Sequence, residues 1–166
     1  MDSFFPDSDY KIPETSKYMK FLEGDNSFRV LSSAIIGYEY FTRDNKPVRM
    51  KTLPDVVPAD IKENGSIKHF WAFVVYNYES KNIQILELTQ KGIMKTMQSY
   101  IKNPKWGNPR EYDFIVTRTG SGMDTEYAIT VNPKSPIDQS VLDRFEKMNI
   151  NLDALFTNED PFKVDN

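Results

Sequence analysis

The hydrophobic pattern of the chain is most unusual between Lys68 and Ser80, which read KHFWAFVVYNYES. A strand that buries one face should alternate apolar with polar residues. This stretch does not alternate, because both of its faces are apolar. One face carries Phe70, Ala72, Val74 and Tyr76, and the other carries Trp71, Phe73 and Val75. The second face must be covered either by more protein or by a ligand that packs against flat rings.

Extended patterns also precede and follow this stretch. From Tyr18 the chain predicts two short extended runs around a turn at residues 23–26. Residues 27–42 are β-branched and aromatic and continue this run as one long strand that changes direction in the middle, with Gly37 as a bend or bulge. Residues 43–67 carry Pro, Asp, Asn and Gly and predict an excursion between strands. Residues 68–78 and 83–88 then predict a hairpin.

Two helices are predicted from apolar residues at helical spacing. The first follows Thr89, a suitable N-cap, and ends before Pro104. The second begins with Ser135 as N-cap and Pro136 at the first helical position. Between the helices, residues 112–131 predict a second hairpin.

The order of these elements indicates the fold class. Five strands with one helix between the third and the fourth predict a mainly β chain, closed into a small Greek-key barrel of the oligonucleotide/oligosaccharide-binding (OB) type. An antiparallel meander sandwich is the competing architecture. We expect a flexible lead-in over residues 1–17, the OB-fold domain over 18–134, a C-terminal helical segment over 135–156 and an acidic tail over 157–166.

Composition narrows the chemistry. The 166 residues suit a single globular domain, with 39% hydrophobic and 27% charged residues. Cysteine is absent and His69 is the only histidine, so neither disulfides nor a Cys/His zinc site can form. We expect no catalytic residues, no cofactor and no metal. Neither a membrane-spanning apolar run nor a signal peptide is apparent, which predicts a cytoplasmic protein without a membrane partner.

Charge is unevenly distributed along the chain. The net charge is −3, yet residues 26–119 carry an excess of five positive charges. The two flanking segments are acidic. This distribution suggests an anion-binding body with an acidic tail.

Three groups of rings are candidate platforms on which nucleic-acid bases could stack. If the small Ala72 and Val74 face the barrel interior, Trp71 and Phe73 lie on its outer face. The alternative is that the N-terminal segment or the C-terminal helix covers Trp71 and Phe73. The other two groups are Tyr76 with Tyr78, and Tyr38 with Tyr40 and Phe41.

Basic residues accompany these rings. A groove for a single strand needs cations for the phosphates among rings for the bases, and residues 38–51, YEYFTRDNKPVRMK, have that composition. The candidate phosphate ligands are Arg29, Arg43, Lys46, Arg49, Lys51, Lys68 and Arg118. Ordinary solvated loop charges are the alternative interpretation.

The last residues, NEDPFKVDN, place Pro-Phe after two acids. Such a tail could compete with DNA for the basic surface and recruit protein partners through an apolar hook. A frayed terminus is the alternative.

Several runs resemble one known family. FWAFVV, LTQK and TRTGSGMDTEY, within a similarity over about residues 18–135, resemble the single-stranded DNA-binding proteins of tailed bacteriophages and prophages, of the helix-destabilising type. The resemblance implies an OB barrel in the host bacterial cytoplasm. It also implies coating of exposed DNA during replication, recombination and repair, without sequence specificity and without enzymatic activity.

Two features depart from related proteins. The T-even phage protein has a structural zinc site, for which this chain has no ligands. Bacterial single-stranded DNA-binding proteins end in an acidic Pro-Phe tip, whereas here KVDN follows EDPF.

The sequence therefore predicts a single-stranded DNA-binding protein whose acidic tail contacts replication or recombination proteins, with a homo-oligomer left open. Two alternatives stay open. One is an RNA-binding OB-fold protein, and the other is a protein-interaction or virion assembly module.

Overall fold

A computed structural model describes Phe4 and residues 17–163. Seven strands form one antiparallel sheet. They are β1 (Gly24–Val30), β2 (Ile35–Phe41), β3 (Pro47–Met50), β4 (Lys68–Asn77), β5 (Asn82–Leu88), β6 (Asp113–Thr119) and β7 (Glu126–Val131). The helices are α1 (Lys91–Lys102) and α2 (Gln139–Met148), with the short turns η1 (Pro109–Glu111), η2 (Gly122–Asp124) and η3 (Leu152–Thr157). The predicted mainly β chain is confirmed.

The long bent strand consists of β1 and β2, which share the same edge of β4. β2 pairs with the first half of β4 and β1 with its last residues, while β5 takes the other edge. The chain changes direction at residues 31–34, between the two strands. The predicted bend at Gly37 is wrong, because Gly37 pairs in register with Phe70. A Cβ at this position would collide with the Met50 carbonyl oxygen, so glycine here allows close approach of β3.

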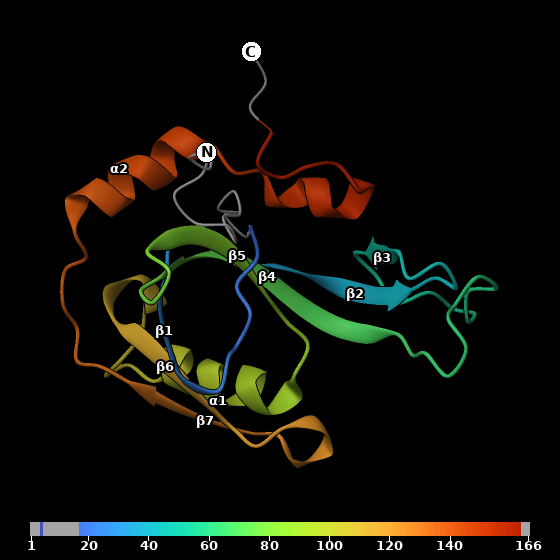
Figure 1. The fold of residues 1–166 in the computed structure, drawn as a ribbon, viewed down its shortest axis with the longest axis horizontal. Coiled ribbons are helices and arrows are strands. Elements are labelled where there is room, and N and C mark those ends of the chain that lie inside the picture. The colour runs from blue at the N-terminus through green and yellow to red at the C-terminus, as the bar shows by residue number, and fades with distance from the viewer. Residues whose placement is uncertain (1–3, 5–16, 164–166) are drawn as a thin grey trace.

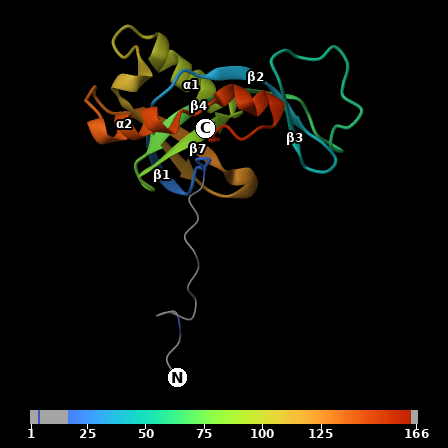
Figure 2. The same cartoon turned by 90° about the horizontal axis from the view of Figure 1, so that it is seen from above.

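Both predicted hairpins are confirmed, as β4–β5 and β6–β7. The structure also shows β3, a short strand within the predicted excursion, which pairs with β2. We did not predict β3, because the excursion is rich in turn-forming residues. The excursion folds back through a bridge between Thr42 and Ile61. Figure 2 shows β3 and this loop as a protrusion at one end of the molecule.

The predicted closed barrel is not formed. The sheet runs in the order β3-β2-β4-β1-β6-β7, with β5 on β4, and no ladder joins β5 to β7 within the residues described. α1 follows β5 in the chain, as predicted, and contacts β7. The sheet therefore stays open.

The two faces of the sheet pack against different helices. Figure 1 shows α1 on one side of the strands and α2 with η3 on the other. On the α1 face, Phe73 and Val75 join a core with Met97 of the helix. On the opposite face, which we call the C-terminal face, Phe70 and Ala72 pack against Leu155 of η3. Both apolar faces of β4 are thus covered in their central part by the chain itself.

Helix starts differ from the prediction by one to three residues. Gln90 precedes α1, in place of Thr89. Asp138 caps α2, in place of Ser135, by accepting the Ser140 N–H, and this bond holds the pKa of Asp138 below its ordinary value. Ser135 is used differently, because its backbone N–H donates to the Glu111 carbonyl and ties the segment before α2 to η1.

The C-terminal residues that are described lie on the domain surface and not away from it. Pro161 is buried, Phe162 packs onto the C-terminal face, and Asp160 pairs with Lys17 at 3.2 Å. The predicted lead-in, residues 1–17, lies outside the described residues except Phe4 and Lys17, and so does the end of the predicted tail, residues 164–166. Across the part that is described, no helix combines the length and apolarity needed to cross a bilayer.

Candidate nucleic-acid interface

A cleft opens between the sheet and α1. Its volume is about 390 Å³. Phe73 and Met97 are buried and form the floor. Trp71 is only partly buried and stands at the opening.

The sheet side of this cleft continues into a row of exposed and partly buried side chains on β2 and β4. Ile36 lies opposite Trp71, and Tyr38 lies opposite His69, so all four share the α1 face. Ile36 is 58% exposed, and the Tyr38 and His69 rings lie 5.1 Å apart. Within the part of the chain that the structure describes, the His69 Nδ1 atom has no hydrogen-bond partner. Apolar surface and rings therefore run from the cleft toward the protrusion.

The helix side of the cleft is basic. Lys91, Lys95 and Lys102 fall on one stripe of α1 at 100° per residue, together with Gln98, and all four are exposed. Gln98 and Lys102 line the cleft. The helix has no acidic residue, and none of the three lysines makes an ion pair with a described residue. Our sequence analysis missed this lysine stripe, although the i, i+4 and i+11 spacing signals it.

Arg110 closes the far end of the cleft. Its Nε donates to the Leu31 carbonyl at 3.3 Å and its Nη2 to Ser33 Oγ at 3.0 Å. These bonds fix the guanidinium between η1 and the turn that follows β1. The Nη1 atom makes no hydrogen bond to the residues described.

The predicted rings divide between the two faces. The predicted orientation of β4 is reversed, because Trp71 and Phe73 face the α1 core and Ala72 faces the C-terminal segments. Tyr40 is buried and its hydroxyl donates to Asp60.

The remaining predicted rings, those of Tyr76, Tyr78 and Phe41, do not line the cleft. Tyr76 and Tyr78 form an edge-on pair with centroids 5.1 Å apart. The Tyr78 hydroxyl donates to Asp113, and burial followed by this bond raises the pKa of Tyr78. Phe41, at the end of β2, is 45% exposed.

Three of the predicted cations are engaged within the protein. Arg29 is 1% exposed and donates through Nε to Asp113 at 2.6 Å, through Nη1 to the Arg110 carbonyl, and through Nη2 to Ser135. Arg118 donates to the Phe21 carbonyl. The third is Arg49, which lies in a buried ionic cluster. These three arginines hold strands and loops together.

One of the exposed predicted cations, Lys68, lines a second hollow. This hollow, of about 620 Å³, is lined by Phe41, Lys62 and Lys68, and by Asn45 from the turn that carries Arg43 and Lys46. Arg43, Lys46 and Lys68 are exposed. Lys51 lies over the Phe156 ring at 5.5 Å. The structure thus brings Phe41 and Lys68 together, away from the Trp71 cleft.

The buried ionic cluster lies beside this hollow. Arg49 pairs with Glu87 at 2.8 Å and with Glu39 at 3.5 Å. Burial raises the pKa of Glu39 to about 8, assisted by Glu87 and opposed by Arg49. As carboxylates, Glu39 Oε2 and Glu87 Oε1 have no hydrogen-bond donor among the described residues. A proton on Glu39 supplies that donor.

Neither a group of metal ligands nor a similarity to known proteins helps to assign a function. Between residues 17 and 163 no three His, Asp or Glu side chains are grouped as metal ligands. No protein-family model, no curated protein and no solved structure matches the chain.

Proposed function

We propose that the protein binds single-stranded DNA without sequence specificity and coats exposed strands during phage replication, recombination and repair. In this proposal the strand lies in the cleft between α1 and the sheet. Bases meet Trp71, Tyr38 and the neighbouring apolar surface, and phosphates meet the lysine stripe of α1.

The strand order supports an OB-type fold for this function. We count β1 and β2 as one bent strand. This bent strand pairs with β4 and with β6. In addition, β4 pairs with β5, and β6 pairs with β7. An OB fold is a partly open five-stranded barrel with this succession, including the helix between the third and fourth strands. The open space between β5 and β7 is the feature that differs from a closed barrel.

The observation that carries the proposal is the juxtaposition of a partly exposed tryptophan with unpaired lysines across one cleft. Rings supply stacking of about 1–3 kcal/mol per base, and cations supply salt-dependent affinity for phosphates. The hollow at Phe41 combines a single ring with cations and could extend the path, but it lies over a buried carboxyl pair.

A charge-matched comparison tests this interface. The triple variant Lys91→Gln, Lys95→Gln, Lys102→Gln removes three cations from α1. The control Lys20→Gln, Lys147→Gln, Lys163→Gln removes three exposed cations from elsewhere. Affinity for labelled oligothymidylate is measured against salt concentration. Because each phosphate contact contributes about 0.7 to the slope for a single strand, the α1 variant should lower the slope by about 2. Equal slopes in the two variants would contradict the proposal.

The RNA alternative uses the same rings and cations, so it needs a direct comparison. Competition between DNA and RNA oligomers of equal length and sequence distinguishes the two, and we expect DNA to be preferred. The protein-interaction alternative arose from the two apolar faces of β4. Since the chain's own helices cover the central residues of both faces, that pattern requires no partner protein.

A further inference from the structure

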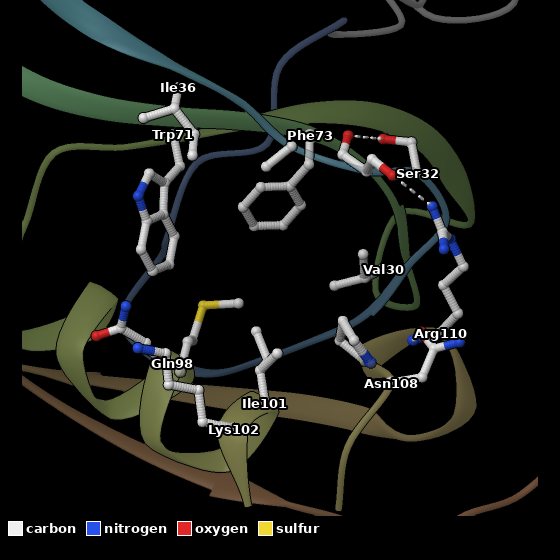
Figure 3. A pocket seen from close by; sticks show the side chains of 14 residues that line it. Val30, Ser32, Ile36, Trp71, Phe73, Gln98, Ile101, Lys102, Asn108 and Arg110 are labelled. Atoms are coloured by element: carbon white, nitrogen blue, oxygen red, sulfur yellow. Dashed lines mark hydrogen bonds between the residues drawn. The ribbon is translucent and has the colours of Figure 1, made fainter.

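The cleft behind Trp71 is deeper than a stacking surface requires. Trp71 and Phe73 enter it from β4 and Ile101 from α1 (Figure 3), and Met97 of α1 also lines it. Its volume is about 390 Å³, and the exposed Ile36, Gln98 and Lys102 among its lining residues show that it is open to solvent. Small-molecule sites begin at about 300 Å³, so the cleft is large enough to hold a planar ligand of the size of a nucleobase.

We propose that this cavity receives one nucleobase of the bound strand, held between the Trp71 ring and the α1 side chains Met97 and Ile101. The inference rests on the proposed function, since it concerns a base within the same single strand. The sugar and phosphates stay outside, beside Lys102 and Arg110 at the two ends of the opening.

The chemistry of the cavity fits a base better than an aliphatic side chain. The lining includes the Trp71 and Phe73 rings, on which a planar base can stack. The rim is polar, with the exposed Gln98 and the free Nη1 of Arg110 available for the edge of a base. Two cations flank the opening, and they would pair with phosphates on either side of the inserted nucleotide.

The cavity tolerates any base. The Gln98 amide both donates and accepts hydrogen bonds, so it can meet each base edge. The apolar walls contact only the faces of the ring, which all bases share. Insertion therefore adds affinity at one position without imposing a sequence.

Filling the cavity tests the proposal. Ala34 lines the cavity from an exposed loop, so Ala34→Phe introduces a ring without altering the buried core. Ala128→Phe, at an exposed position of β7, is the matched control. The probes are an oligothymidylate of about 12 nucleotides, within the span of one OB fold, and an oligomer of equal length made of abasic deoxyribose phosphates.

We expect the substitution to lower affinity only for the oligomer that carries bases. Ala34→Phe should lower affinity for oligothymidylate by about 5- to 100-fold, which is the loss of one stacked base, and leave affinity for the abasic oligomer unchanged. Ala128→Phe should change neither. Thermal unfolding checks that both variants are folded, and Ile101→Phe provides a second filled cavity from the opposite wall.

Two other results would overturn different claims. Normal oligothymidylate binding by folded Ala34→Phe and Ile101→Phe would exclude base insertion and leave the proposed function standing. Failure of the unmodified protein to bind any oligonucleotide at low salt would exclude the proposed function itself.

Discussion

At the residue scale, the buried cluster of Glu39, Arg49 and Glu87 shows how burial changes the charge of a side chain. One arginine faces two carboxyl groups from three different strands, with Lys68 at the edge. Two carboxylates cannot both be compensated by one cation in a region of low dielectric constant. Glu39 therefore keeps its proton at neutral pH, and its pKa rises from 4.5 to about 8.

This raised pKa predicts a pH-dependent stability. Between the unfolded pKa near 4.5 and the folded value near 8, the folded state binds more protons than the unfolded state. The free energy of unfolding should consequently fall as pH rises through this window. Glu39→Gln mimics the protonated side chain, so it should be more stable than the unmodified protein at pH 9 by at least about 1.4 kcal/mol, the equivalent of one pKa unit.

Urea unfolding at a series of pH values measures this effect. Glu146→Gln, at an exposed position of α2, is the control and should keep the original pH profile. Parallel profiles for Glu39→Gln and the unmodified protein would refute a protonated Glu39.

The environments of some individual side chains could not be predicted from the sequence. Arg29 and Arg43 look alike along the chain, but Asp113 and Ser135, more than eighty positions away, bury Arg29. Side-chain size suggested an outer face for Trp71 on the condition that Ala72 and Val74 face the interior. That condition is not met, because α1 supplies large partners on the Trp71 side that size alone does not reveal. In both cases the environment of the side chain depends on residues that are distant in the sequence.

At the element scale, two glycines have opposite structural roles. A Cβ at Gly37 in β2 would meet the Met50 carbonyl oxygen and, at 3.0 Å, the Phe70 and Phe156 rings. A Cβ at Gly92 in α1 would meet nothing within 4 Å. The strand glycine is required by packing, whereas the helix glycine only weakens its helix.

Alanine substitutions should separate these roles. Gly37→Ala should lower the free energy of unfolding by about 1–3 kcal/mol through overpacking. Gly92→Ala should raise it by up to about 1 kcal/mol, because alanine favours the helix. Chemical denaturation of both variants measures the difference. Equal effects of the same sign would contradict the close approach of β3 to β2.

Element order was the most predictable level of the structure. Hairpins and helices follow from local periodicity and turn residues, which is why 68–78, 83–88 and 112–131 were correctly predicted as β-structure. β3 was missed because its four residues lie among turn formers. The lysine stripe of α1 was readable from spacing, but its relation to Trp71 depends on how the helix crosses the sheet.

At the scale of the whole molecule, the C-terminal segments act as the cover for one face of the sheet. Val141 of α2 packs with Val74 and Ile83, and Leu155 of η3 packs with Phe70 and Ile85. Phe162 continues this layer. Recruitment of partner proteins by the tail stays a prediction, and it would have to compete with the packing of Phe162.

Removal of this ring should therefore affect stability. Phe162→Ala should lower the free energy of unfolding by about 2 kcal/mol, less than the roughly 3–5 kcal/mol of a fully buried phenylalanine. Val56→Ala, at a side chain that is 77% exposed, should have little effect. Thermal or urea unfolding gives both values. No loss of stability in Phe162→Ala would indicate that this end of the chain is dispensable for the fold.

The central claim is that single-stranded DNA occupies the cleft at Trp71. The chain has two tryptophans, and Trp106→Phe leaves Trp71 as the only one. Titration of this variant with poly-dT at low salt should quench the tryptophan fluorescence, and added salt should restore it as the phosphate contacts are lost. Unchanged Trp71 emission throughout the titration, at protein and DNA concentrations where a labelled strand reports binding, would contradict the account.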